Sequence, residues 1–438
     1  MTSPFIARRA HFLNLIGDGV ALIPTAPERL RNRDNPHPYR ADSYFWHLTG
    51  FPEPEAVLVL AGGRSTLFCR EKDALREIWD GFRYGPEAAA QTFGFDEAYP
   101  IATLDEKLPH LIADHPTLWH AFGLDAEWDA RIARALDAVR AQARQGKRAP
   151  SALCDWRAPL DALRLIKDAA EQDLMRRAAD ITSAGHARAM RASIHTAKTE
   201  YALEAELSYE FRRQGASGHA YSPIVAGGKN ACTLHYVDNS QPLIDGDLVL
   251  IDAGCEFAGY AADITRTFPV NGRFSPAQKD CYEIVLAAQS AAIAATRPGV
   301  RFNVPHEAAA RVLTQGMVDL KLLAGDVDGL IESAAYRRFY MHNTAHWLGL
   351  DVHDAGDYKE AGSSPNLWRE LAPGMTLTCE PGLYIPAAPD VPAALHNIGI
   401  RIEDDLLITP TGCEVYTSAP KSVREIEELM RHAAQEEF

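Results

Sequence analysis

The chain has 438 residues and a formal net charge of −15 at pH 7. This charge argues against a nucleic-acid partner, because phosphate binding depends on concentrated Lys and Arg. No stretch approaches the ~18 apolar residues that a membrane-spanning helix needs, and no signal-peptide pattern follows the amino terminus. The seven cysteines are scattered and odd in number, which is typical of a reducing compartment. We therefore expect a cytoplasmic protein that binds neither nucleic acid nor a membrane.

The first part of the chain mixes short apolar runs with helical patterns. Strands are predicted at residues 20–24, 56–60 and 65–69, and helices near residues 74–81 and 126–145. This mixture predicts an α/β amino-terminal domain, which we assign to residues 1–170.

Residues 171–438 are expected to form a second domain of the α+β class. An apolar periodicity over residues 160–190 predicts one helix with Pro159 in its first turn, and the domain boundary is expected in or before it. Further helices are predicted at about 199–214, 275–295 and 305–322, with a terminal helix over 421–438. Apolar strands surround or follow these helices.

Two aspartates, Asp252 and Asp263, stand in segments that otherwise read as apolar strands. An ionised carboxylate is costly to bury without a compensating cation. Side-chain alternation places Asp252 on one face of the first strand, and Asp263 on the same face of the second as Thr265 and Thr267. If the two strands pair as a hairpin around the Gly-containing turn, both carboxylates converge on one point.

Three further side chains, His346, Glu380 and Glu403, stand in apolar or turn-forming contexts. Together with the two aspartates they supply four carboxylates and one imidazole. Four negative charges match two divalent cations, whereas one ion would leave the site negative. We therefore predict two divalent metal ions. Oxygen-rich ligation with no thiolate favours manganese, with cobalt, iron or zinc as alternatives.

Several neighbouring residues are interpreted differently. Cys255 and Cys379 lie beside ligand candidates, but alternation points them to the opposite strand face, so we expect them to be packing residues. His342 and His346 form an H-x-x-x-H pair, but Asn343 replaces the Glu that a zincin uses as its base, which argues against a metalloprotease helix.

The order Asp, Asp, His, Glu, Glu resembles the dinuclear-metal aminopeptidases of the pita-bread fold, and among them the Xaa-Pro aminopeptidase (aminopeptidase P) family. The motifs are Ile251-Asp252-Ala-Gly, Asp263-Ile-Thr-Arg, His346-Trp-Leu-Gly-Leu-Asp-Val-His353-Asp, Glu380-Pro-Gly and Arg401-Ile-Glu403-Asp-Asp. Residues 39–57, Glu77-Ile-Trp79, Arg164-Leu-Ile-Lys167 and Thr233-Leu-His235-Tyr extend the likeness over nearly the whole chain. Asp252, Glu380 or Glu403 taken singly would be read as a turn or edge residue, but the combination favours a site.

This resemblance implies a carboxyl-terminal pita-bread catalytic domain behind a smaller α/β domain. It also implies the metal roles: Asp252 and Asp263 bind one ion, Asp263 and Glu403 bridge the two, and His346 and Glu380 complete the second.

The resemblance further implies roles in catalysis and substrate binding. His235 and His353 would stabilise the oxyanion, and Glu380 would move the proton. His342, Tyr384 and Arg401 would surround the proline and the residues after it. His396 lies outside any motif and is expected to be a hydrogen-bonded core histidine.

Family members use the amino-terminal domain of a neighbouring subunit to close the active site, with a Trp that matches Trp79 near the substrate. The alternative for Trp79 is a buried core anchor. A homodimer or homotetramer is implied by the same resemblance.

The predicted function is a metal-dependent exopeptidase that releases the first residue from peptides with proline in second position, by means of a metal-bridging hydroxide. One alternative is an Xaa-Pro dipeptidase (prolidase), which uses the same five ligands. The other is a non-catalytic binding module that keeps the pita-bread shape. Two segments that border the expected substrate pocket, Asn343-Thr344-Ala345 and His235-Tyr-Val-Asp, depart from the usual family wording and bear on specificity.

Overall fold

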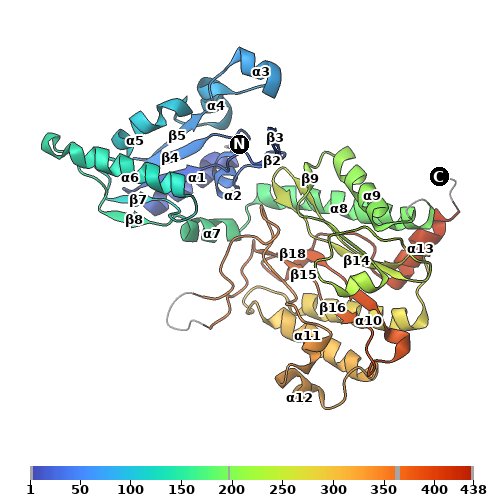
Figure 1. The fold of residues 1–438 in the computed structure, drawn as a ribbon. Coiled ribbons are helices and arrows are strands. Elements are labelled where there is room, and N and C mark those ends of the chain that lie inside the picture. Colours follow the sequence, from blue (N-terminus) through green and yellow to red (C-terminus); the bar gives the residue numbers. More distant parts are fainter. Residues whose placement is uncertain (1–2, 196–197, 361–365, 436–438) are drawn as a thin grey trace. The chain divides into compact units, whose positions relative to one another are not determined.

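The computed structural model describes residues 3–195, 198–360 and 366–435. The chain divides into two compact units, Met1–Arg164 and Leu165–Phe438 (Figure 1). Each unit has hydrophobic clusters of its own. None of the helices in the described ranges is long and apolar enough to cross a membrane.

The first unit is built on a six-stranded sheet with the strand order β6-β5-β4-β1-β7-β8. Neighbours β1, β4 and β5 are antiparallel and the outer pairs are parallel. The strands are β1 (Val20–Pro24), β4 (Val57–Ala61), β5 (Arg64–Cys69), β6 (Glu97–Pro100), β7 (Thr117–Trp119) and β8 (Ala152–Cys154), and a two-stranded ribbon joins β2 (Leu30–Asn32) to β3 (Asn35–Pro36).

Helices cover both faces of this sheet. Successive strand residues point to opposite sides, and here the residues on both sides are apolar. In β1, Ala21 and Ile23 belong to one cluster, whereas Val20 and Leu22 belong to the other. The helices are α1 (Pro4–Ile16), α2 (Ser43–Thr49), α3 (Ala74–Asp80), α4 (Gly85–Phe93), α5 (Leu104–Ile112), α6 (Ala126–Ala141) and α7 (Arg157–Leu165). The predicted α/β character and the three predicted strands are confirmed; the helix expected to reach residue 145 ends at Ala141 and is followed by a 3-10 turn.

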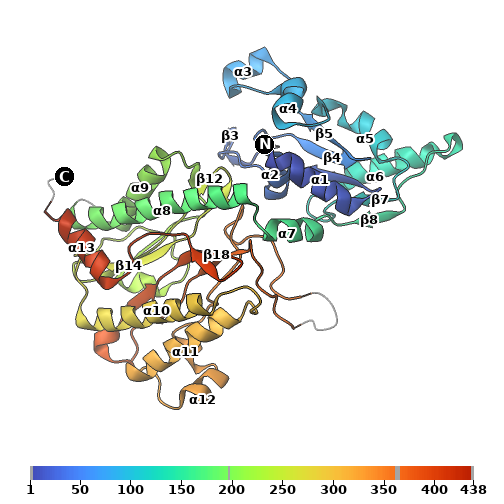
Figure 2. The ribbon, with the colours of Figure 1, turned by 180° about the vertical axis from the view of Figure 1, so that it is seen from behind.

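The second unit is α+β, as predicted. Its helices are α8 (Ala169–His195), α9 (Glu200–Arg213), α10 (Pro276–Ala295), α11 (Val304–Asp319), α12 (Val327–Glu332) and α13 (Val423–Ala433). Figures 1 and 2 show α8 and α9 on one side of the central strands and α10 and α11 on the other. Helices α9, α10 and α11 agree with the predicted ranges apart from their ends. The terminal helix is shorter than expected, and residues 436–438 of that prediction lie outside the described residues.

Short antiparallel ladders lie between these helices: β10-β11-β14, β13-β12-β9, β15-β18-β19 and β16-β17. Their strands are β9 (Gly218–His219), β10 (Ile224–Gly227), β11 (Leu248–Asp252), β12 (Cys255–Phe257), β13 (Tyr260–Ala261), β14 (Thr265–Pro269), β15 (Thr376–Cys379), β16 (Gly382–Ile385), β17 (Ile398–Arg401), β18 (Asp404–Ile408) and β19 (Cys413–Val415).

The prediction of a single helix over residues 160–190 is wrong, because the helix is interrupted between α7 and α8. The backbone N–H of Lys167 donates to the carbonyl of Gly374, a partner far along the sequence, at 2.8 Å. Asp168 then accepts from the N–H of Glu171, whose carboxylate accepts from the N–H of Asp168. This reciprocal cap starts a new helix.

The predicted hairpin that carries the two aspartates is confirmed in part. Strands β11 and β14 pair antiparallel with Asp252 opposite Thr265. The connection is more than a Gly-containing turn, since it contains the small β12-β13 hairpin. Asp263 does not lie in a strand; β14 begins two residues later. A Cβ on Gly254 would lie 1.6 Å from the carbonyl oxygen of Ala262, so the crossing of the chain at this point requires glycine.

Candidate active site

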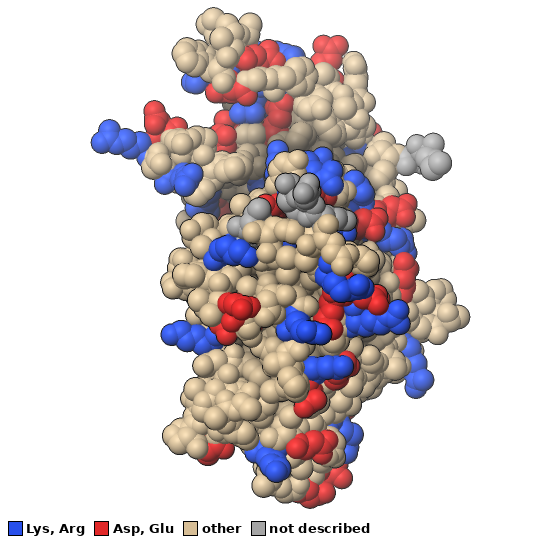
Figure 3. All heavy atoms as spheres, turned by 90° about the vertical axis from the view of Figure 1, so that its right-hand side faces the viewer, with Lys and Arg blue, Asp and Glu red and all other residues tan. Residues whose placement is uncertain are grey.

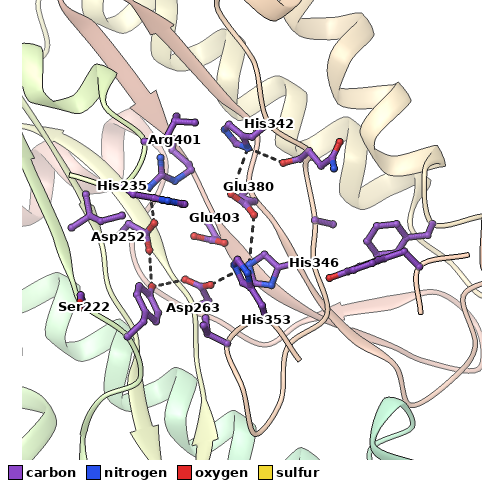
Figure 4. Close-up of a pocket in the computed structure, with 18 of the residues that line it drawn as sticks. Ser222, His235, Asp252, Asp263, His342, His346, His353, Glu380, Arg401 and Glu403 are labelled. Atoms are coloured by element: carbon purple, nitrogen blue, oxygen red, sulfur yellow. Dashed lines mark hydrogen bonds and ion pairs between the residues drawn. The ribbon is translucent and has the colours of Figure 1, made fainter. Parts of the chain in front are cut away.

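The five candidate ligands come from separate elements of the second unit and face one point (Figure 4). Asp252 ends β11 and Asp263 precedes β14. His346 lies in a non-helical segment next to the bridge between Trp347 and Leu377, so the expectation that it is not in a metalloprotease helix is confirmed. Glu380 directly follows β15, and Glu403 lies between β17 and β18.

The two aspartates converge as the sequence predicts. The hydroxyl of Tyr221 lies 2.6 Å from Oδ1 of Asp252 and 2.5 Å from Oδ1 of Asp263. A hydroxyl has one proton to donate. The Tyr221 hydroxyl can therefore donate to only one of the two carboxylates at a time.

The remaining ligands close the cluster. Nε2 of His346 lies 3.4 Å from Oδ2 of Asp263 and 3.6 Å from Oε1 of Glu380. One ligand atom each from Asp263, His346 and Glu403 lie within 4.8 Å of one another. Nδ1 of His346 is 3.0 Å from the carbonyl oxygen of Trp347, which fixes the ring so that Nε2 faces the carboxylates.

Electrostatics favour cations at this point. Burial, with repulsion from Asp263 and Asp252, raises the pKa of Glu380 to about 7. Burial and the nearby carboxylates also raise the pKa of Glu403 well above its usual range. Burial lowers the pKa of His346, but Asp263 and Glu380 outweigh it and raise this pKa to about 9. Glu380 and Glu403 are thus held against ionisation by burial and by neighbouring negative charge. A set of four carboxylates and one imidazole fits divalent ions.

Arg401, Tyr384 and His342 form a hydrogen-bonded row beside the cluster. Nη2 of Arg401 lies 2.6 Å from Oδ2 of Asp252, and Nη1 donates to the hydroxyl of Tyr384 at 2.9 Å. The same hydroxyl is 2.8 Å from Nε2 of His342. Burial and the charge of Arg401 lower the pKa of His342 to about 3, so its ring is neutral at physiological pH.

His235 and His353 complete the ring of polar groups. The ring of His353 lies 4.1 Å, centroid to centroid, from that of His346. Burial and His346 lower the pKa of His353. Both histidines line a cavity of about 930 Å³ that also contains the candidate metal ligands, and Figure 4 shows them on either side of the carboxylates. A cavity of this size accommodates a short peptide.

Comparison with known proteins settles the family. The family model for metallopeptidase family M24 matches residues 173–410, and that for the aminopeptidase P N-terminal domain matches residues 5–119. The chain belongs to metallopeptidase family M24. The Xaa-Pro aminopeptidase of Escherichia coli K12 is 46% identical over 416 residues, which cover 94% of this chain and 93% of that protein.

Solved structures agree with this M24 assignment. The aminopeptidase PepP of Pseudomonas aeruginosa matches with a TM-score of 0.95 at 49% identity, over 98% of each chain. Zinc-substituted Escherichia coli aminopeptidase P in complex with product matches with a TM-score of 0.93 at 44% identity, again over 98% of each chain. The predicted pita-bread domain behind an α/β domain is thereby confirmed, and M24 membership implies divalent metal ions.

Three residues near the candidate ligands were missed by the sequence analysis. They are Tyr221, Thr265 and Asp405. The hydroxyl of Thr265 donates to Oε2 of Glu403 at 2.6 Å, and the carboxylate of Asp405 accepts from the N–H of Asp263 at 3.2 Å. The position of Thr265 on the Asp263 side of its strand was the only signal in the sequence. Tyr221 lies too far along the chain for any local pattern to find it.

Other expectations concern residues outside the cluster. Cys255 and Cys379 are buried in the hydrophobic core, as predicted. His396 is partly buried and its Nε2 is 3.0 Å from the carbonyl oxygen of Val391, which agrees with a hydrogen-bonded structural role. Trp79 lies on α3 with 84% of its surface exposed, so the alternative of a buried core anchor is wrong.

Proposed function

We propose that this protein is a metal-dependent Xaa-Pro aminopeptidase, an exopeptidase that releases the first residue from peptides with proline in second position. The observation that carries the proposal is the buried set of four carboxylates and one histidine at the wall of a peptide-sized cavity, in a chain that matches aminopeptidase P over both of its parts. The same comparisons favour an aminopeptidase over a prolidase or a non-catalytic module.

Two divalent ions would be held by the five ligands. Asp252 and Asp263 would hold one ion, Asp263 and Glu403 would be shared by both ions, and His346 and Glu380 would complete the second. The ligand atoms favour manganese, with cobalt, iron or zinc as alternatives. Ions bound here would supply an acidified water and positive charge for the scissile carbonyl.

The proton of the attacking water would pass to Glu380 and then to the leaving nitrogen. A carboxylate suits this role when it stands within reach of both atoms. Glu380 is aligned for it by Thr378, whose hydroxyl lies 3.5 Å from Oε1, and by the carbonyl of Thr344, which accepts the N–H of Glu380 at 2.8 Å.

His235 and His353 would donate hydrogen bonds to the carbonyl oxygen as its negative charge develops. Fixed donors at an oxyanion are among the largest contributions to catalysis. The residues around the proline would be His342, Tyr384 and Arg401. Because the nitrogen of a prolyl bond carries no hydrogen, selection of proline must come from the shape of this pocket rather than from a hydrogen bond.

The amino-terminal domain, assigned to residues 1–170, would serve assembly and closure of the active site by a neighbouring subunit. The support is α3, which has no buried residue. It presents three exposed apolar side chains, Leu75, Ile78 and Trp79, and the exposed Phe82 follows the helix by two residues. Apolar patches of this kind favour protein contacts. A homodimer or homotetramer in which Trp79 approaches the partner's substrate follows from the proposal. Trp79→Ala tests it by sedimentation and by the Michaelis constant.

The partners proposed are peptides alone, and the location proposed for the protein is the cytoplasm. On the face shown in Figure 3, Lys and Arg side chains are interspersed with Asp and Glu. An interspersed surface with a net charge of −15 gives no steering of nucleic acid.

Hydrolysis of Ala-Pro and Ala-Pro-Ala by metal-stripped protein, before and after addition of Mn²⁺, tests the function. Metal-dependent release of Ala from the tripeptide, with little action on the dipeptide, supports the aminopeptidase. The reverse preference makes the protein a prolidase. A protein that takes up no metal and cuts neither peptide is a binding module.

A further inference from the structure

The segment that carries His235, residues 233–240, is a wall between two cavities. Leu234, His235 and Val237 line the active-site cavity, whereas Tyr236 and Asp238 line a second cavity of about 680 Å³. A segment with open space on both sides cannot be fixed by close packing alone. Its position must therefore depend on specific polar contacts.

The backbone of this wall supplies few such contacts. Thr233 donates its N–H to Asn230, but residues 234–240 make no hydrogen bond between main-chain groups within the described parts of the chain. The ring of His235 is exposed and has no hydrogen-bond partner among the described residues. The orientation of His235 is thus set by whatever holds the wall.

One buried carboxylate bonds the wall at Tyr236 and also bonds residues that precede and follow the wall. Glu200, the first residue of α9, has no exposed surface. Its Oε1 accepts from the N–H of Gly227 at 2.8 Å and from Nδ2 of Asn230 at 2.9 Å. Its Oε2 accepts from the hydroxyl of Tyr236 at 2.8 Å and from the N–H of Gln241 at 2.8 Å. Hydrogen bonds to a charged acceptor are the strong ones.

A second tether acts further along. Oδ1 of Asn239 accepts from the N–H of Val225 at 2.9 Å, and its Nδ2 donates to Glu204 at 2.9 Å. This tether fixes the end of the wall near Gln241. The Tyr236 hydroxyl bond to Glu200 is the contact next to His235 in the sequence.

We infer that Glu200 is a positioning residue for catalysis: it holds the wall so that His235 faces the scissile carbonyl. The inference rests on the proposed function, because His235 matters only if the protein cleaves peptides. A displacement of about 1 Å in a catalytic group can cost about 10²-fold in rate. Loss of the Glu200 contacts therefore lowers turnover without removing any group that touches substrate or metal.

The test uses three variants of the full-length protein. Glu200→Gln keeps the size of the side chain but turns one acceptor into a donor that faces donors. Tyr236→Phe removes only the hydroxyl of the wall, and keeps the test open if Glu200→Gln fails to fold. Glu210→Gln is the matched control, because Glu210 is a buried carboxylate on the same helix that bonds Arg213 and Gln214 instead.

We expect Glu200→Gln to lower kcat about 10- to 100-fold, and Tyr236→Phe to lower it less, with little change in the Michaelis constant or in bound metal. Hydrogen exchange of the Gly227 and Gln241 amides, which donate to Glu200, should become faster in Glu200→Gln and stay unchanged in Glu210→Gln. Unchanged exchange of these two amides in folded Glu200→Gln overturns the inference.

A double-mutant cycle separates positioning from general damage. If Glu200 acts through His235, then Glu200→Gln should have no further effect on kcat in a His235→Ala background. Losses that multiply in full in that background overturn the inference. If metal-loaded wild-type protein cleaves neither peptide, the proposed function fails and the catalytic part of the inference fails with it. Faster exchange of the Gly227 and Gln241 amides in Glu200→Gln would still establish the tether.

Discussion

Arg401 forms a buried ion pair with Asp252, one of the candidate metal ligands. Nη2 lies 2.6 Å from Oδ2, and the side chains are 4% and 13% exposed. Burial raises the pKa of Asp252, but the charge of Arg401 and the hydrogen bonds from Tyr221 and Arg401 together outweigh burial and bring this pKa below its usual range. The arginine thus keeps the ligand ionised, at the cost of competing with a cation for it.

Replacing this arginine should make metal binding depend on pH. In Arg401→Met the pKa of Asp252 rises, so protons compete with metal as the pH falls. Each unit by which this pKa exceeds the assay pH weakens metal binding about tenfold. Calorimetric titration with Mn²⁺ at pH 8 and pH 6 measures the difference. Arg338→Met, at an exposed pair with Asp390, is the control and should bind metal as the wild type does.

Asp263→Asn should abolish activity while the fold remains. Asp263 stands between the Tyr221 hydroxyl and His346 and is the proposed bridge, so its loss removes a charge shared by both ions. We expect metal analysis to find fewer than two ions per chain and circular dichroism to be unchanged. Asp245→Asn, at an exposed aspartate, should keep full activity. Full turnover by Asp263→Asn with two bound ions would refute the bridging assignment.

The candidate ligands were predictable because their combination leaves a trace in the sequence, although Asp252, Glu380 or Glu403 taken singly would be read as a turn or edge residue. A carboxylate in an apolar strand, such as Asp252, conflicts with its surroundings unless a cation is near. Side-chain alternation and the Gly-containing turn expected between the strands then bring Asp252 close to Asp263. The exact backbone of Asp263 was not predictable, since the extra β12-β13 hairpin depends on a close chain crossing at Gly254.

Residues whose role depends on distant partners left no such trace. The helix break at Lys167 follows from its bond to Gly374, more than two hundred residues away. Glu200 reads in the sequence as an ordinary first-turn glutamate, which is favourable at a helix amino terminus. Only the folded chain brings Gly227, Tyr236 and Gln241 to its two oxygens.

His353→Ala should lower kcat by about 10²-fold or more if the ring stabilises the oxyanion. The ring is close to His346 but is not a proposed ligand, so the metal content should not change. Steady-state kinetics with Ala-Pro-Ala measure this, and His396→Ala serves as the control. An unchanged kcat with a raised Michaelis constant would make His353 a binding residue instead.

Asp354→Asn should destabilise the protein by about 3–5 kcal/mol, because it removes one of the two charges of a buried ion pair. Nζ of Lys167 lies 2.7 Å from Oδ2 of Asp354, and both side chains are 1% exposed. Urea unfolding measures the loss. The double variant Lys167→Met with Asp354→Leu should lose much less than the sum of the single changes. If the double variant loses as much free energy of unfolding as the sum of the single changes, the interaction between Lys167 and Asp354 does not stabilise the fold.

His186 should make the protein less stable as the pH falls below neutral. The ring lies wholly inside the second unit, with Nε2 3.0 Å from the carbonyl oxygen of Ala253. Burial lowers its pKa from the usual 6.5 to about 4. Between pH 6.5 and pH 4 the ring is protonated in the unfolded chain but not in the folded chain. The free energy of unfolding therefore decreases as the pH falls through this range, by roughly 3 kcal/mol in all.

The variant His186→Gln keeps a donor for the carbonyl of Ala253 but has no group that titrates here. Its free energy of unfolding should fall less steeply than that of the wild type between pH 7 and pH 5, as measured by urea titrations at several pH values on metal-stripped protein. His432→Gln, at an exposed position in the last turn of α13, should leave the pH dependence of the free energy of unfolding as it is in the wild type. Equal slopes for His186→Gln and wild type would mean that the pKa of His186 is the same in the folded and the unfolded chain. The burial of His186 would then not cause the loss of stability at low pH.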